Sequence, residues 1–143
     1  DLQRLRLGMS LADTYRQVWS SARGHWRVSP QTRYIVPSRF GYCPFVFRVA
    51  EGGWRRDSFE GSHDRFMATE GYWIDVERER LIHLGAPDPH DAWLPTARVA
   101  AEAPTEEDLA VARVLSGKII ALGAGQKNIT IRLRQKNRTL NFD

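Results

Sequence analysis

The sequence contains one cysteine, Cys43, and no long apolar run among its 143 residues. A single cysteine cannot form an internal disulfide and excludes zinc sites built from several thiolates, so we expect a reducing compartment and a buried, inert thiol. No segment approaches the roughly 20 apolar residues that a membrane-spanning helix requires. The first ten residues lack the apolar core of a signal peptide, which predicts a cytoplasmic protein. Because the chain does not begin with Met, it is compatible with a fragment of a longer protein.

Lysine is also scarce, since only three of the 21 basic residues are lysines. The formal net charge is +4, but it is unevenly distributed. Residues 1–60 carry a net +5, residues 61–107 a net −6 and residues 108–143 a net +5. This pattern predicts a folded particle with a basic side and an acidic side. The excess of arginine favours bidentate contacts with phosphates or bases. A GC-rich genome, which raises arginine content everywhere, is the alternative explanation.

Length and composition predict a single β-rich domain over residues 1–143, with two helices. Ser10 is a suitable N-cap, and apolar residues at helical spacing then predict a helix over residues 11–23. Thr105 is the N-cap of the second helix, because three acidic side chains follow it where the helix dipole favours anions. The apolar stripe that follows predicts a helix over residues 105–122.

Short β-prone runs separate the two helices. Residues 54–59 are the expected hairpin partner of residues 45–49, across a Glu-Gly-Gly turn. Residues 85–104 hold four prolines and predict an ordered surface loop that Trp93 and Leu94 pin to the body. The other expected strands are residues 34–36, 66–69, 72–76, 80–84, 128–134 and 139–142, of which the last two form a terminal hairpin. The predicted fold class is α+β, with a small, curved, antiparallel, barrel-like sheet and two flanking helices.

The terminal hairpin is the most specific candidate for binding. In residues 128–134 the apolar side chains point one way, and Arg132 and Arg134 point the other way, about 7 Å apart. That spacing is close to the phosphate repeat of a nucleic-acid strand. Lys136 and Arg138 continue the basic series into the turn. A solvated edge strand that uses charge to prevent aggregation is the alternative interpretation.

Cationic and aromatic residues alternate through residues 23–56. Exposed rings flanked by arginines can stack bases while the arginines hold the backbone. A concave aromatic pocket can instead hold one flipped base. The alternative is that the tryptophans belong to the core, although five tryptophans are many for a small core. The candidate binding residues in this region are Trp26, Arg27, Tyr42, Trp54, Arg55 and Arg56.

Two histidine-containing loops and one acidic run are weaker candidates for metal-assisted chemistry. Residues 60–64 and 88–91 each place a histidine beside carboxylates, but neither has a known metal-ligand spacing. Asp75, Glu77 and Glu79 place three carboxylates at period two, as either a nuclease-type metal site or a solvated face would. Ordinary surface composition explains all three groups, so we predict no metal ligand, no cofactor and no catalytic residue.

One ordered set of motifs lies in the N-terminal half. It consists of Trp-Arg-Val-Ser at residues 26–29, the apolar run at residues 45–49, a glycine turn, Trp54, and Phe-Glu-Gly at residues 59–61. This order resembles small β-rich bacterial domains of the PUA-like group of nucleic-acid readers. The resemblance implies a compact, curved β-barrel with flanking helices and a pocket for a modified or flipped base. It includes no catalytic motif and assigns no site residue.

The leading hypothesis is a non-enzymatic domain that binds DNA or RNA through an arginine-rich surface and an aromatic patch or pocket. It expects the N-terminal third and the final hairpin to form one continuous cationic wall around the rings. A second hypothesis is a protein–protein interaction module, which docks a partner through the basic side or through the acidic middle segment. A third is a metal-dependent hydrolase or nuclease that uses the histidine loops.

Overall fold

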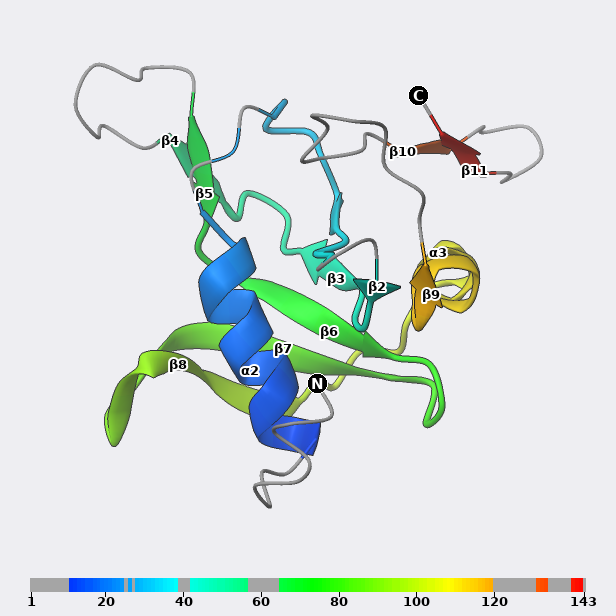
Figure 1. Ribbon diagram of the computed structural model, residues 1–143. Coiled ribbons are helices and arrows are strands. Elements are labelled where there is room, and N and C mark those ends of the chain that lie inside the picture. The colour runs from blue at the N-terminus through cyan, green and yellow to red at the C-terminus, as the bar shows by residue number, and fades with distance from the viewer. Residues whose placement is uncertain are drawn as a thin grey trace.

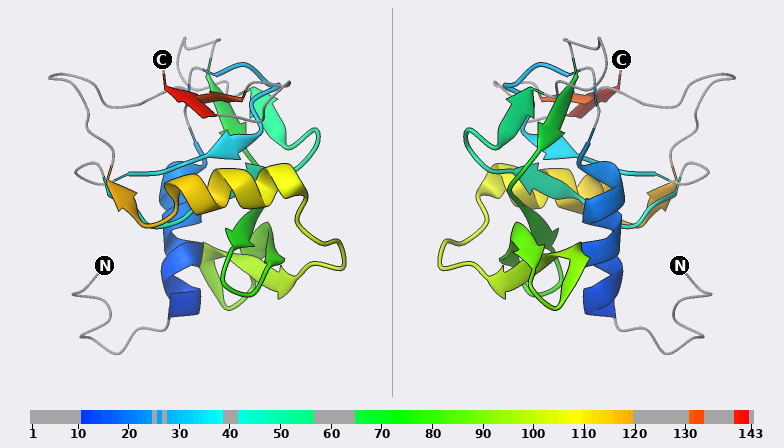
Figure 2. Two further views of the ribbon diagram at one scale, coloured as in Figure 1. Left: turned by 90° about the vertical axis from the view of Figure 1, so that its right-hand side faces the viewer. Right: turned by 90° about the vertical axis from the view of Figure 1, so that its left-hand side faces the viewer.

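The computed structural model describes residues 11–24, 26, 28–38, 42–56, 65–119, 131–133 and 140–142. Within this part of the chain, an antiparallel sheet packs against two helices, α2 and α3 (Figures 1 and 2). Neither described helix is long and apolar enough to cross a membrane.

The main sheet has the strand order β1-β3-β6-β7-β8, and every neighbouring pair is antiparallel. The predicted α+β class with two helices is confirmed. Three two-stranded ribbons account for the other described strands, and no closed barrel is found among the residues described. The strands of the main sheet are β1 (Tyr34–Ile35), β3 (Phe47–Val49), β6 (Gly71–Asp75), β7 (Arg80–Asp88) and β8 (Asp91–Val99).

The two faces of the main sheet bury separate apolar clusters. Successive side chains of a strand point to opposite faces, so Trp73 belongs to the cluster under α2 and Ile74 to the cluster under α3. Phe45, Phe47 and Val49 alternate along the run predicted as a strand at residues 45–49, and all three are buried in the α2 cluster. The sheet is therefore the middle layer between the two helices.

Helix α2 (Leu11–Ala22) crosses the sheet with its predicted apolar face inward (Figure 1). The Tyr15 ring stacks on Trp73 with centroids 4.2 Å apart, and Trp19 is fully buried. Gly71 makes this packing possible, because a Cβ at that position would lie 2.6 Å from Cη2 of Trp19. The helix ends at Ala22, one residue before its predicted end.

Helix α3 (Glu106–Leu115) starts as predicted, with a capping box between Thr105 and Asp108. The predicted extension to residue 122 is wrong. Gly117 adopts a left-handed φ of 72°, which terminates the helix, and its N–H donates to Cys43 O at 2.7 Å. The chain then forms β9 (Lys118–Ile119), which pairs with β2 (Tyr42–Cys43).

The predicted loop over residues 85–104 is mostly a long hairpin, because β7 and β8 continue to Asp88 and Val99. Its prolines are accommodated because β8 is an edge strand and the β7–β8 register shifts on both sides of Pro87. Helix α2 covers part of this edge, since Arg16 donates to Pro95 O and Ser20 Oγ donates to Trp93 O. The expectation that Trp93 pins the segment is also wrong, because its side chain is 84% exposed.

The expected pairing of residues 54–59 with residues 45–49 is wrong. Both edges of β3 are occupied by β1 and β6, so β4 (Trp54–Arg56) pairs with β5 (Phe66–Ala68) instead of returning along β3. The turn expected after β3 is present, and Gly52 has a φ of 70°. The predicted terminal hairpin is confirmed in its described part, where β10 (Ile131–Leu133) pairs with β11 (Leu140–Phe142).

Candidate nucleic-acid interface

The β4–β5 pair is extended by a third segment just after α2. Trp26 exchanges two backbone hydrogen bonds with Phe66, with N···O distances of 3.0 and 2.8 Å. The Ala68 N–H donates to Arg23 O at 2.6 Å. Chain segments about 40 residues apart in sequence therefore lie side by side. We call Arg23, Trp26, Trp54–Arg56 and residues 65–68 the arginine ribbon.

The register of the arginine ribbon places positive charge on both of its faces. Arg55 lies opposite Met67 and Arg56 lies opposite Phe66, so the two arginines point to opposite faces. Both side chains are exposed. The Arg56 guanidinium carbon is 5.8 Å from the centroid of the Phe66 ring, within the range of a cation–π contact.

The two indoles of the arginine ribbon are half-buried and anchored through their N–H groups. Trp54 Nε1 donates to Thr32 O at 2.7 Å, and its ring packs against the α2 cluster. Trp26 Nε1 donates to Ala22 O. Trp54 therefore serves the core in part, as the alternative interpretation expected, while both rings keep some exposed surface.

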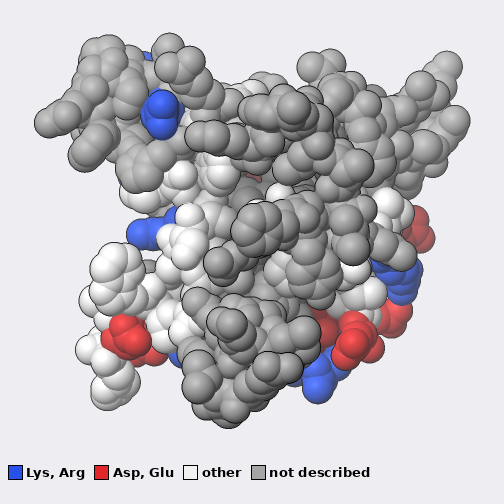
Figure 3. Space-filling model, in the orientation of Figure 1, with Lys and Arg blue, Asp and Glu red and all other residues white. Residues whose placement is uncertain are grey.

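The ribbon arginines lack carboxylate partners among the described residues, whereas six of the seven other arginines with described side chains form ion pairs, and Arg98 is the exception. Among the described residues, no carboxylate forms an ion pair with Arg23, Arg55, Arg56 or Arg65, and Arg65 Nε is buried without a hydrogen-bond partner. Figure 3 shows a small blue patch at the upper left, where β4 and β5 lie, and neighbouring red and blue side chains at the lower right. The arginines that do form ion pairs are Arg16, Arg33, Arg48, Arg78, Arg80 and Arg113.

The structure brings together four of the predicted binding residues, namely Trp26, Trp54, Arg55 and Arg56. Two other predicted residues lie in different elements. Tyr42 lies in β2 against β9, and Arg132 lies in β10 opposite Asn141. Figure 1 draws β10–β11 on the opposite side of the molecule's upper half from β4–β5. The predicted residues that lie outside the described part of the chain are Arg27, Arg134, Lys136 and Arg138.

The polar clusters suggested by the sequence have structural roles where they are described. Asp88 accepts from Arg16 at 2.6 Å and from the His90 N–H at 2.9 Å, which fixes the tip of the β7–β8 hairpin. Both hydrogen bonds favour the ionised carboxylate and lower the pKa of Asp88, and the bond from the His90 N–H has the larger effect. No group of three metal-ligating side chains occurs among the described residues. The loop at residues 60–64 lies outside them.

The acidic run does not form one strand face. Asp75 is buried at the end of β6 and pairs with Arg80 at 2.9 Å. Glu77 and Glu79 lie in the following turn and are exposed, and Glu79 pairs with Arg113 of α3 at 2.8 Å. The carboxylates are thus separated by the turn instead of converging on a metal.

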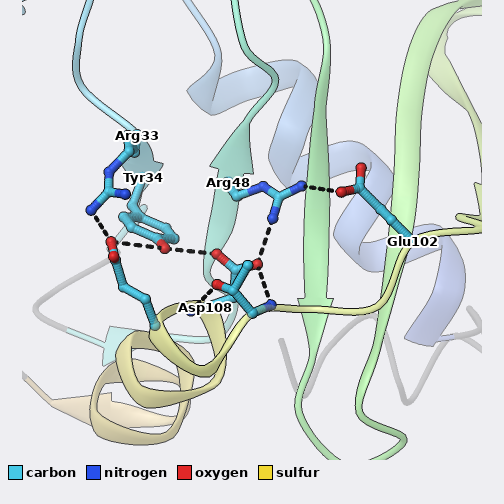
Figure 4. Close-up of polar contacts among 7 residues, drawn as sticks. Arg33, Tyr34, Arg48, Glu102 and Asp108 are labelled. Atoms are coloured by element: carbon cyan, nitrogen blue, oxygen red, sulfur yellow. Dashed lines mark hydrogen bonds and ion pairs between the residues drawn. The ribbon is translucent and has the colours of Figure 1, made fainter.

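Sequence reasoning missed a buried polar network that joins α3 to the sheet (Figure 4). Asp108 is 1% exposed and accepts from Arg48 at 2.5 Å and from Tyr34 Oη at 2.7 Å. Arg48 also pairs with Glu102 at 3.2 Å. Arg33 pairs with Glu107 at the edge of the same network. The only sequence signal was the position of Asp108 in the capping box, which does not identify partners 60 and 74 residues away.

Burial and charge act together on the titratable groups of this network. Burial and the Asp108 carboxylate raise the pKa of Tyr34 well above its ordinary value, so its hydroxyl remains a donor. Burial lowers the pKa of Arg48, but the Asp108 and Glu102 carboxylates outweigh that effect, and its net pKa is raised. The network is fully satisfied and closed by its own side chains, so it serves as a structural clamp.

No known protein family matches this chain, and no curated protein or solved structure was found to be similar to it.

Proposed function

We propose that this chain is a non-enzymatic nucleic-acid-binding domain and that the arginine ribbon contacts the phosphates. One observation carries the proposal: among the described residues, four arginines without carboxylate partners gather on one ribbon, while six of the seven other arginines are paired. Unpaired like charges repel one another in the free protein, and a polyanion relieves that repulsion. Displacement of counterions from the phosphates adds a favourable, salt-dependent contribution to binding.

The geometry of the ribbon supports contact with two rows of phosphates. Arg55 and Arg56 project from opposite faces of a two-stranded ribbon. The major groove of a duplex admits such a ribbon, and its phosphates line both walls. In this arrangement Arg55 contacts one wall and Arg56 the other. The half-buried rings of Trp26 and Phe66 add apolar contact at the base of the ribbon.

Ion pairs within the molecule engage much of the acidic segment at residues 61–107, which favours nucleic-acid binding over docking of a basic protein. Several carboxylates of residues 61–107 are engaged inside the molecule, which leaves less free negative charge for a partner. These carboxylates are Glu70 with His83, Asp75 with Arg80, Glu79 with Arg113, Asp88 with Arg16, Glu102 with Arg48 and Glu107 with Arg33.

The test is binding of fluorescently labelled duplex DNA, single-stranded DNA and RNA, measured by anisotropy. The double variant R55A/R56A should weaken binding of the preferred nucleic acid by about tenfold or more. The matched control is R78A/R113A, which removes the same charge from two exposed arginines that are paired with carboxylates. Equal losses in the two double variants would show that only net charge matters. Retention on heparin with no binding of any nucleic acid would favour the protein-interaction alternative.

A further inference from the structure

A pocket of about 300 Å³ lies between α2 and the curled end of the β7–β8 hairpin. Its walls come from segments far apart in the sequence, since α2 supplies Trp19 and Ser20, and β7 supplies Gly85 and Pro87. Residues 92–95 of β8 form the outer wall, and Arg23 lies at the end next to the arginine ribbon. This volume is at the small end of ligand-binding pockets.

The outer wall of the pocket is held in place by hydrogen bonds. Arg16 donates to Pro95 O at 3.0 and 2.8 Å and to Asp88 at 2.6 Å. Ser20 Oγ donates to Trp93 O, and the Trp93 N–H donates to Asp91 at 3.0 Å. The backbone of Trp93 is thus tied at two points while its side chain is 84% exposed. A large exposed indole on a fixed backbone contributes little to folding, and it is a preferred contact residue in binding sites.

One cationic side chain lines the pocket. Arg23 has no carboxylate partner in the described part of the chain. The other lining side chains are mainly apolar, from Pro87, Ala92, Trp93, Leu94 and Pro95.

We propose that this pocket binds a small carboxylic acid with an aromatic or aliphatic body. Arg23 donates to the carboxylate, and the body of the ligand lies against Trp93 and the two prolines. The positive charge of Arg23 matches a carboxylate, and the apolar wall matches a hydrocarbon body. The pocket shares Arg23 with the arginine ribbon but uses no residue of β4 or β5, so the variant R55A/R56A distinguishes this proposal from nucleic-acid binding.

The test uses 3-phenylpropionate as the probe and the five indole N–H signals in ¹H–¹⁵N spectra of the full chain as the readout. The signals of Trp19 and Trp93 should shift together and give one Kd, while those of Trp26, Trp54 and Trp73 stay in place. R23Q should raise the Kd of the probe by about tenfold or more, as expected for the loss of a charge-assisted hydrogen bond. The neutral analogue 3-phenylpropionamide should bind the wild-type chain with a similarly raised Kd.

Two further variants keep the outcome interpretable. W93A removes a side chain that is 84% exposed, so it should fold normally and weaken the probe. R55A/R56A should bind the probe with unchanged Kd even though it loses nucleic-acid binding, which separates the two proposals. The pocket assignment is overturned if neither indole signal moves, if all five move equally, or if the amide binds as tightly as the carboxylate.

Discussion

Replacing Asp108 with alanine should cause a large loss of stability, because this carboxylate connects α3 to the sheet. It is 1% exposed and accepts from Arg48, from Tyr34 Oη and, at 3.0 Å, from the Thr105 N–H. Breaking a buried ion pair by removing one partner costs about 3–5 kcal/mol, since the other charge is left uncompensated. Glu102 still pairs with Arg48, so the lower end applies, and loss of half of the capping box adds about 0.5–1 kcal/mol. We therefore expect D108A to lose about 3–4 kcal/mol of unfolding free energy.

Urea unfolding followed by tryptophan fluorescence at neutral pH measures this loss. E77A is the matched control, because Glu77 is an exposed acid in the β6–β7 turn and should change stability by less than about 0.5 kcal/mol. R48M/D108L should lose less than D108A, because replacing both charges with apolar groups leaves no unpaired ion. A loss below about 1 kcal/mol in D108A would refute the clamp. So would a loss in R48M/D108L as large as that in D108A.

Three further outcomes follow from individual contacts. G71A should destabilise the protein by about 1–3 kcal/mol in thermal unfolding, because its Cβ would lie 2.6 Å from the Trp19 ring; an unchanged Tm would contradict this packing. The folded state lowers the pKa of the Asp88 carboxyl, so the contact with Arg16 should stabilise the hairpin tip fully at pH values above the pKa of that carboxyl in the unfolded chain. This stabilisation should be lost as the pH falls through the lowered pKa of the folded state. Amide shifts of the hairpin in a pH titration should show this acid transition in the wild type but not in D88N. Cys43 is fully buried and burial raises its thiol pKa, so a thiol reagent should react slowly with the native chain and rapidly in urea; fast native labelling would place the thiol at the surface.

Sequence patterns predicted the helix starts and strands that are specified by residues within the same segment. Alternation identified β3 and the described part of the terminal hairpin, because inward and outward positions repeat every two residues. The cap at Thr105 identified the start of α3, because its side chain bonds the first turn of its own helix. The end of α3 was missed because apolar residues continue past Gly117, and only the left-handed backbone at that glycine interrupts the helix.

Contacts between distant segments were not predictable from these patterns. The prolines of residues 85–104 suggested a loop, but an edge strand with register shifts tolerates proline, and side chains from α2 bond its free carbonyls. Arg48 gave no sign that its partner would be Asp108. For the candidate site, the sequence identified Arg55, Arg56, Trp26 and Trp54, yet it could not show that Arg23 and Arg65 join them, because strand pairing decides that.

The most direct measurement of the central claim is the slope of log K against log salt concentration for nucleic-acid binding. The wild-type chain should show a steep negative slope, and R55A/R56A should reduce its magnitude by about 1.4–1.8, since each phosphate contact contributes about 0.7–0.9. The control R78A/R113A should keep the wild-type slope. A flat wild-type slope, or equal slopes in all three proteins, would contradict phosphate binding by the arginine ribbon.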